Sequence, residues 1–461
     1  MVYKSKTDLN FTKYLKSKWL TDVKDYELKK RTIVVNISNT NAMISGPEPR
    51  KVLQPRKSAI LKGVKVISAE SLVLIKVPDD INIGGCVLED GWCQLTAQVP
   101  TFPEDVPLYK SPQFDVGSVK FDPYAVTGTV ETSSTGSILK KFNVKVNVWF
   151  CPAKTNCGIH NVHTDPEMLE VHTQIYGTGR MQKFHSEDFK SIYEDVLMAP
   201  GFTHDPFAGV KDNDCFQSDL RNMVYKTKNR LKFTKCLKSK WLTDVKDYEL
   251  KKRTIVVNIS NTDAIISGPK PRKVLQPRKS TILEGVSVIS AESLVLIKIS
   301  DEINIGGCVL EDGWCQLTSQ DPTYPRDVPL YKSPQFDVGF VELDPYVVTG
   351  SKKPSVSNGA VKKFNIKVNV WFCPAKTNCG IHNNHTKPEM LEVHTQIYGT
   401  GRMQKFHSKD FKSIYEDVLM APGFTHDPFA GVKDNGDIFY GWHQYYSDTD
   451  CIWMAIEYHP A

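Results

Sequence analysis

Long apolar runs are absent from this sequence of 461 residues. No window approaches the roughly 18 apolar residues that a membrane-spanning helix needs, so we expect no membrane contact. Residues 1–11 alternate charged and polar side chains where a secretory signal would have an apolar core, which predicts a cytoplasmic protein. Cysteine is dilute, at 11 residues, and without an export signal we expect reduced thiols that mostly pack in the core.

Charge of one sign is nowhere concentrated. The formal net charge of +6 comes from 58 Lys and Arg residues against 52 Asp and Glu residues, spread through the chain. Even the lysine-rich residues 13–30 include Asp22, Asp25 and Glu27. This mixture is typical of a solvated surface and argues against a nucleic-acid partner. A glycine-rich phosphate loop is also missing, because Gly177 and Gly179 lack the later glycine of such a motif.

The sequence repeats itself almost verbatim. Aligning Met1 with Met223 gives a constant offset of 222 residues, with no gap until Asn213 meets Asn435. A period this long indicates duplicated domains and not a solenoid. The chain also exceeds the length at which one hydrophobic core stops growing. Because a methionine opens each copy, we expect two adjacent genes joined in one reading frame.

The two copies differ beyond the end of the repeat. Copy two continues through residues 436–461, whereas copy one has only a linker, residues 214–222, before copy two begins. The tail contains an apolar and aromatic run, residues 451–458, that predicts a buried strand. Copy one is therefore incomplete or takes this strand from elsewhere, and an open sheet edge would favour a homo-oligomer. Copy two is the better candidate for activity.

Strand patterns dominate each copy. Residues 142–150 alternate apolar and polar side chains, as a half-buried strand does, and residues 31–37 and 72–77 also favour strands. Helix patterns are confined to residues 13–28 and 187–195, which predict short amphipathic surface helices. The fold class is therefore all-β with few short helices, arranged as a sandwich or jelly roll.

A stretch rich in Ser, Thr and Gly divides each copy. It covers residues 127–136 in copy one, is the most divergent part of the repeat, and predicts an exposed loop. The expected domains are β-rich N-terminal halves at residues 1–126 and 223–348, and C-terminal barrels at residues 137–213 and 359–461.

Histidines gather in the C-terminal half of each copy. Only His443 and His459 lie outside the repeat. Since imidazole is the commonest neutral ligand for divalent transition metals, a histidine-ligated site would have to lie in these halves. The repeated histidines are His160, His163, His172, His185 and His204 in copy one, and His382, His385, His394, His407 and His426 in copy two.

Two motifs resemble the signatures of the cupin superfamily. The first is the Gly-Ile-His-Asn-Val-His run at residues 158–163, followed by Glu170, Gly177 and Gly179. The second is Pro-Gly-Phe-Thr-His at residues 200–204. The resemblance covers roughly residues 141–207 and 363–429. It implies cupin-type jelly-roll barrels in two tandem copies, each with a metal held inside by histidines and a carboxylate. The N-terminal halves would then be degenerate barrels.

The resemblance also implies the site residues. The expected metal ligands are His163, Glu170 and His204 in copy one, and His385, Glu392 and His426 in copy two. Further ligands or acid–base groups would be His160 and His172, and their counterparts His382 and His394. Two or three imidazoles with one carboxylate suit Fe, Mn, Ni or Zn. The resulting prediction is a metal-dependent enzyme acting on a small organic substrate, as an oxygenase, isomerase or lyase.

Other interpretations of the same residues stay open. Glu170, His172 and Gln174 share one face of a predicted strand, and plain alternation would place this polar face in solvent and Val171 and Ile175 inside. A structural zinc site could instead use the two cysteines and two histidines of residues 151–163. The barrel could also be non-catalytic and bind a sugar or small metabolite, or the chain could be a β-protein without any site.

Overall fold

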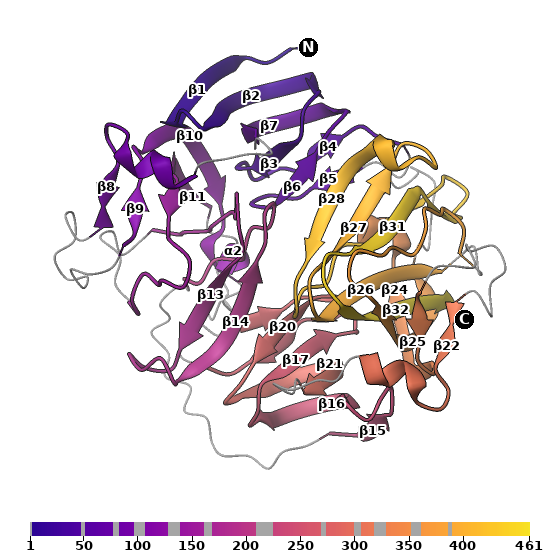
Figure 1. Ribbon diagram of the computed structural model, residues 1–461. Coiled ribbons are helices and arrows are strands. Elements are labelled where there is room, and N and C mark those ends of the chain that lie inside the picture. Colours follow the sequence, from indigo (N-terminus) through magenta and orange to yellow (C-terminus); the bar gives the residue numbers. More distant parts are fainter. Residues whose placement is uncertain are drawn as a thin grey trace.

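The computed structural model is an all-β protein, as the sequence predicts (Figure 1). Within the described residues the only α-helices are two short ones, α2 (Pro123–Thr127) and α4 (Pro345–Thr349). No helix among these residues is long and apolar enough to cross a membrane. The described residues are 2–47, 51–76, 83–95, 107–127, 139–160, 168–208, 225–268, 273–298, 306–317, 329–351, 361–385 and 390–461.

Both predicted amphipathic helices are wrong. Residues 13–28 lie mostly in strand β2 (Leu15–Leu28), and residues 187–195 run into strand β14 (Ile192–Met198). Leu20 and Val23 of β2 are buried three positions apart, which imitates a helical period. The spacing arises because Asp22 has a positive φ of 47°, as has Asp25 at 52°, so the strand turns and its alternation is interrupted.

The N-terminal halves of the two copies have the same strand order. The sheet of copy one runs β1-β2-β7-β3-β6, and that of copy two runs β15-β16-β21-β17-β20. Each sheet encloses its own apolar cluster, in which Leu20, Leu61 and Leu72 of copy one are fully buried. The strands are β1 (Ser5–Thr12), β3 (Thr32–Asn36), β4 (Ala42–Ile44), β5 (Lys51–Leu53), β6 (Ser58–Leu61), β7 (Val64–Lys76), β15 (Thr227–Leu231), β16 (Lys238–Leu250), β17 (Thr254–Asn258), β18 (Ala264–Ile266), β19 (Lys273–Leu275), β20 (Ser280–Leu283) and β21 (Val286–Lys298).

The copies exchange strands. Strands β13 (Gly179–Phe184) and β14 of copy one extend the sheet of copy two through β20, and β27 (Gly401–Phe406) and β28 (Ile414–Met420) of copy two extend the sheet of copy one through β6 (Figure 1). The exchange carries side chains with it, because Tyr415 of copy two packs in the core of copy one and Tyr193 of copy one in that of copy two. Each copy therefore completes a sheet of the other.

The C-terminal half of copy two forms a small barrel of two facing layers. One layer has the order β25-β32-β26, and β32 pairs along its length with both neighbours. The other layer is β28-β27-β31, and Tyr445 of β31 stacks on Trp453 of β32 across the interior, with ring centroids 3.9 Å apart. The strands are β25 (Lys362–Cys373), β26 (Leu391–Tyr398), β31 (Trp442–Ser447) and β32 (Cys451–Pro460).

The predicted terminal strand is confirmed as β32, whose residues from Cys451 to Ile456 are almost fully buried. In copy one, residues 142–150 form two strands, β11 (Lys140–Val146) and β12 (Trp149–Phe150), whereas the equivalent β25 is continuous. Most side chains of β25 from Phe364 onward are buried, but those of β11 are exposed or half-buried. Among the described residues of copy one, no strand takes the place of β32, so this part of the barrel is open.

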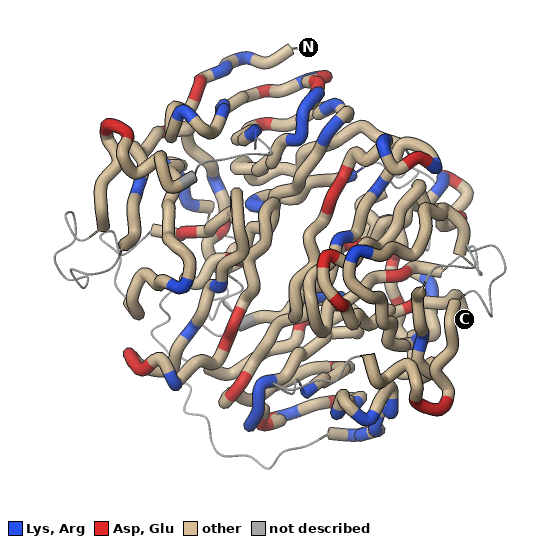
Figure 2. Tube along the Cα trace, viewed as in Figure 1, with Lys and Arg blue, Asp and Glu red and all other residues tan. Residues whose placement is uncertain are grey.

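Short elements connect these layers. They are the strands β8 (Cys93–Gln94), β9 (Tyr109–Lys110), β10 (Phe114–Phe121), β22 (Cys315–Gln316), β23 (Tyr331–Lys332), β24 (Phe336–Leu343), β29 (Ala430–Val432) and β30 (Ile438–Tyr440), and the 3-10 helices η1 (Ile83–Leu88), η2 (Gly306–Leu310) and η3 (Phe411–Ser413). Of the predicted loop at residues 127–136, Thr127 is the last residue of α2 and the others lie outside the described residues, as does the linker at residues 214–222. Lys and Arg are interspersed with Asp and Glu along the trace of both copies (Figure 2).

Candidate metal centre

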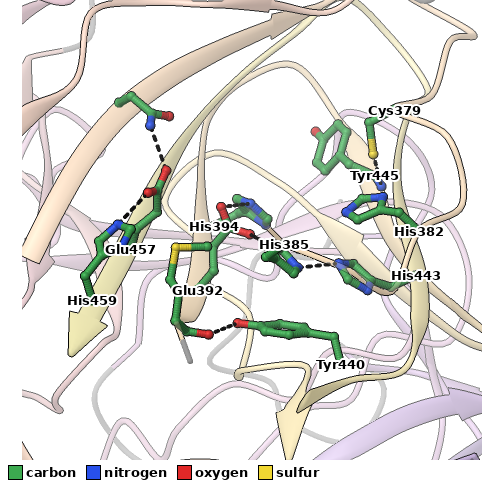
Figure 3. A network of polar contacts seen from close by, with 12 residues as sticks. Cys379, His382, His385, Glu392, His394, Tyr440, His443, Tyr445, Glu457 and His459 are labelled. Atoms are coloured by element: carbon green, nitrogen blue, oxygen red, sulfur yellow. Dashed lines mark hydrogen bonds and ion pairs between the residues drawn. The ribbon is translucent and has the colours of Figure 1, made fainter. Parts of the chain in front are cut away.

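Three imidazoles meet inside the closed barrel of copy two. His382 and His385 come from the loop between β25 and β26, and His443 comes from β31. One ligand nitrogen from each lies within 4.8 Å of the others, and the rings of His382 and His443 have centroids 4.4 Å apart (Figure 3). This group is a site that a divalent metal ion could occupy, because imidazole nitrogens are favoured ligands of such ions.

Hydrogen bonds fix how each ring is turned. The Nδ1 of His443 lies 2.8 Å from the carbonyl of Gly441, and the Nδ1 of His382 lies 2.9 Å from that of Gly380. A carbonyl only accepts, so each Nδ1 carries the proton and each neutral ring presents an unprotonated Nε2. The Nδ1 of His385 lies 3.5 Å from a carboxylate oxygen of Glu392, a longer electrostatic contact that favours the same tautomer. The Nε2 atoms of His385 and His443 then face each other at 3.3 Å, as two ligands of a shared cation do.

Burial keeps these rings uncharged. It lowers the pKa of His382 to about 4 and the pKa of His443 well below its ordinary value, and the neighbouring imidazoles lower both further. The pKa of His385 is lowered by burial as well, despite Glu392. Burial alone would raise the pKa of the Glu392 carboxyl, but His394 and His385 beside it hold it below its ordinary value. The donor set is thus neutral imidazoles next to one carboxylate, which fits a divalent cation.

Glu392 links the three-histidine group to a second pair of rings. Its carboxylate lies 3.4 Å from the Nε2 of His394, whose Nδ1 lies 3.0 Å from the Nε2 of His426. The Nδ1 of His426 in turn lies 2.6 Å from the carbonyl of Asp427. Glu392 therefore stands between the two histidine groups and can orient both.

Other polar groups bound the site. Tyr440 packs against the ring of His385 with centroids 4.0 Å apart, and its hydroxyl donates to the carbonyl of Met390 at 3.0 Å (Figure 3). Glu457, which pairs with Glu392 across β32 and β26, accepts from the amide of Asn369 at 2.9 Å and lies 2.8 Å from the Nε2 of His459. These contacts hold the carboxylates and rings in place.

The structure brings together most of the residues expected in copy two, with one rearrangement. His385 and Glu392, expected as ligands, lie in contact, and His382, expected as a further ligand or acid–base group, belongs to the three-histidine group. His426, expected as a ligand, pairs with His394 and lies outside that group. His443 was not expected as a ligand. Its signals were its place beside the terminal strand and its absence from copy one.

The polar face of β26 points into the barrel. The side chains of Glu392 and His394 are only 11% and 12% exposed. They are therefore buried, and the alternative in which this polar face lies in solvent is wrong for copy two. Val393 and Ile397, on the opposite face, pack in the core shared with the N-terminal half. Both faces of the strand are buried because the barrel covers one and the N-terminal sheet covers the other.

The described residues of copy one form no equivalent group. His160 is exposed, with its Nδ1 3.2 Å from the carbonyl of Gly158, and His163 lies outside the described residues. Glu170 and His172 lie 3.4 Å apart with side chains 36% exposed, and His172 meets His204 at 2.8 Å. Within the described part of the chain, the three-histidine group of copy two is the one place where three ligand-type side chains converge.

The cysteines take no part in that group. The Sγ of Cys379 accepts a hydrogen bond from the backbone of Tyr445 at 3.0 Å, and burial raises the pKa of its thiol to about 12. Cys373 contacts the hydroxyl of Thr377 at 2.9 Å. Both thiols pack in the core, and neither belongs to the cluster formed by His382, His385 and His443.

A separate cavity lies where the copies meet. Its volume is about 280 Å³, and it is lined by Gln54 and its repeat counterpart Gln276, with Arg56 and Lys57 nearby. His204, expected as a ligand in copy one, also lines it, beside Asp205. Lys57 pairs with Asp205 at 2.6 Å, so the cavity is a polar junction and is distinct from the three-histidine group.

Comparisons with known proteins return solved structures alone. No family model and no curated protein match the chain. The chain is similar to an oxalate oxidase in complex with the substrate analogue glycolate, at 13% identity over 21% of this chain and 42% of that chain, with a TM-score of 0.15. It is also similar to the oxalate decarboxylase from Bacillus subtilis at pH 4.6, at 12% identity over 49% and 69% of the two chains, with a TM-score of 0.17.

The chain thus spans less than half the length of the oxalate oxidase that it matches. At these TM-scores a function has to be inferred from the residues of the site itself.

Proposed function

We propose that copy two is a metal-dependent enzyme of the cupin type that acts on a small organic substrate. The observation that supports this most is the convergence of three neutral imidazoles, His382, His385 and His443, inside a closed barrel. His385 and Glu392 come from the motif that resembles the first cupin signature. A bound divalent metal would supply Lewis acidity, polarising a substrate oxygen or lowering the pKa of a bound water.

The protein's own groups have separate roles in this proposal. The three rings hold the metal through their Nε2 atoms, and the carbonyls of Gly380 and Gly441 fix two of the tautomers. The Glu392 carboxylate lies 3.5 Å from the Nδ1 of His385 and favours the orientation of this ring electrostatically. The stacked Tyr445 and Trp453 close the barrel and keep water from the interior. His394, between Glu392 and His426, is the group placed to exchange a proton.

Elemental analysis of the purified chain tests this proposal. We expect about one transition-metal ion per chain, because among the described residues the three-histidine group forms in copy two alone. His382→Ala should abolish stoichiometric metal. His160→Ala changes the same position of the repeat in copy one and should leave the metal content unchanged, which makes it the matched control.

Two results would contradict the proposal. One is a purified chain that binds no transition metal after dialysis against Mn, Fe, Ni or Zn. The other is a metal content that His382→Ala and His443→Ala leave unchanged. A small ligand that binds equally well after chelation would instead favour a non-catalytic barrel that binds a sugar or metabolite.

A further inference from the structure

The barrel of copy two contains a β-hairpin in a slot between its strands. The described strands of copy one form the same slot without that hairpin. In copy two, the hairpin of β31 and β32, which we call the terminal hairpin (residues 441–461), fills a slot between β25, β26 and β27. Residues 168–186, which supply half of this slot in copy one, recur unchanged as residues 390–408. Strand β11 differs from the matching part of β25 only at Val144, which is Ile366 in copy two. The same residues therefore line a filled slot and an unfilled one.

Among the described residues, no strand fills the slot of copy one. Strand β27 pairs with β28 on one side and β31 on the other, whereas β13, within the described residues, pairs with β14 alone. Likewise β25 pairs with β24 and β32, but β11 pairs only with β10 among the described strands. Unpaired backbone groups along two facing edges are what an incoming hairpin satisfies.

Two glycines of each copy show where the hairpin of copy two makes close contact. Gly399 has a φ of +69°, and a Cβ there would collide with the backbone of Asp450 in the turn of the terminal hairpin. Its counterpart Gly177 has a φ of +66°, and nothing lies within 4 Å of the same Cβ position. Gly401 abuts Tyr445, whereas Gly179 has only the side chain of Gln174 near it, at 3.6 Å. Gly177 thus has the same left-handed backbone as Gly399 but lacks the close contact that Gly399 makes with the hairpin.

The inner wall of the slot is already formed in copy one. Thr173 and Thr203 share a hydroxyl contact of 2.6 Å, and the backbone of Gln174 donates to Phe202 at 2.9 Å. The matching contacts of copy two, between Thr395 and Thr425 and between Gln396 and Phe424, measure 2.7 Å and 2.9 Å. Met168, at the mouth, is 39% exposed, whereas its counterpart Met390 is 4% exposed. The slot is preorganised, with apolar surface left to cover.

We propose that copy one is an acceptor for a β-hairpin supplied by a partner chain, with the apolar and aromatic pattern of this protein's own terminal hairpin. One strand of the partner would insert between β11 and the segment that matches β26, and the other would pair with β13. Each chain has two slots but one terminal hairpin, so exchange between identical chains cannot fill both. The inference concerns backbone pairing and does not depend on the proposed metal.

A peptide of residues 441–461 with Cys451→Ser, labelled with fluorescein, tests the proposal against the full chain in the presence of EDTA. We expect saturable binding by fluorescence anisotropy at one peptide per chain. Hydrogen exchange should show new protection in β11 and β13. A peptide of scrambled sequence is the control. Absence of saturable binding, or of protection in these strands, would overturn the proposal.

A variant separates this slot from displacement of the chain's own hairpin. Gly179→Leu fits the free chain, since only Gln174 is near, but it would collide with the tyrosine of a bound hairpin as Gly401 shows. We expect peptide affinity to fall by about tenfold or more, because an overpacked contact costs of order 1–3 kcal/mol. Lys190→Leu, at an exposed position outside the slot, should have no effect. Equal binding to the Gly179→Leu chain would show that the peptide enters copy two and would refute the acceptor role.

The bound peptide also brings a counterpart of His443 beside His160. If the proposed function holds, metal content should rise from about one to about two ions per chain when peptide is bound. If the peptide binds but the metal content does not rise, a second metal centre is contradicted while the docking proposal stands.

Discussion

The most consequential single side chain outside the metal centre is Glu416. It is fully buried between Lys51 of copy one and Lys405 of copy two, with the Lys405 ammonium at 2.9 Å. The Lys405 ammonium also lies 4.2 Å above the ring of Phe429. One carboxylate therefore offsets two buried cations at the point where strands from the two copies meet.

Glu416→Gln should destabilise the protein strongly. The substitution removes the carboxylate that contacts both ammonium groups and leaves Asp427 as the remaining anion that acts on them. Breaking such a buried pair costs about 3–5 kcal/mol. Urea unfolding should show a lower midpoint. Glu284→Gln, at an exposed position, should change the free energy of unfolding by no more than about 0.5 kcal/mol. Equal stability of the two variants would contradict this role for Glu416.

The same carboxylate predicts an acid limb in stability. Burial would raise the pKa of Glu416, but Lys405 and Lys51 hold it below its ordinary value of 4.5. Since the folded pKa lies below the unfolded one, the stabilisation is complete above about pH 4.5 and is lost as the pH falls toward the folded pKa. Unfolding free energies measured from pH 6 to pH 3 should fall more steeply for the natural chain than for Glu416→Gln. Parallel curves would disprove the acid limb.

In the metal centre, Glu392→Gln should weaken metal binding while leaving all three rings in place. The amide would no longer place a negative charge 3.5 Å from the Nδ1 of His385. Loss of such an orienting partner costs about 10–100-fold in metal affinity. Competition titration with a chromophoric chelator measures the change. Glu170→Gln, its counterpart in copy one, should leave the affinity of the chain unaltered.

Sequence motifs located His382, His385 and Glu392 because the residues of one loop and one strand lie close in the chain. They did not identify His443, which reaches the site from β31, 58 residues beyond His385. Pairing across a barrel depends on strand order, which local spacing does not encode. His426 was expected as a ligand, but its ring contacts His394 instead. The motif places this histidine in a loop and does not say which side chain its ring will meet.

At the scale of elements, the terminal hairpin distinguishes the two copies. The alternation at residues 142–150 predicted one strand, yet nearly identical alternation yields a continuous β25 and an interrupted β11 with β12. The difference is the neighbour β32, which pairs with β25 over ten positions. Strand pattern therefore predicts where a strand can form, while its length depends on which edge it meets. Strand β2 was mistaken for a helix because two residues with positive φ altered its period.

The pair Gly399→Ala and Gly177→Ala isolates the contribution of the hairpin contact. Both positions have a left-handed backbone, so alanine should cost about 1 kcal/mol at each. Only at position 399 does the new methyl group also collide with Asp450, which should add about 1–3 kcal/mol. Thermal unfolding of both variants measures the difference. A loss at position 177 as large as that at position 399 would show that the turn itself causes the cost.

At the scale of the whole molecule, the two copies form one interlocked unit. Asp195 of copy one lies 3.3 Å from Arg253 of copy two, and Asp417 of copy two lies 3.9 Å from Arg31 of copy one. Phe202 and Phe424 meet edge to face at 5.2 Å. The duplication was evident from the sequence, but this crossing was not, since both copies contain the residues needed for either a crossed or an uncrossed pairing.

Cleavage between the copies should therefore leave them together. A protease site placed in residues 214–222 should give two fragments that co-elute in size-exclusion chromatography under native conditions and separate only in denaturant. The uncut chain with the same insertion is the control. Fragments that elute separately in native buffer would argue that the exchanged strands contribute little to association.

The crossing of strands also restricts how the repeats can drift apart. A substitution in β14 or β28 is felt in the opposite repeat, so a change that suits one half must be tolerated by the other. Residues 188–213 and 410–435, which include these strands, are letter-for-letter identical. Divergence is instead concentrated near residues 127–136 of the sequence. Mutational scanning should find that a destabilising substitution in β14 or β28 is compensated by substitutions in the opposite copy.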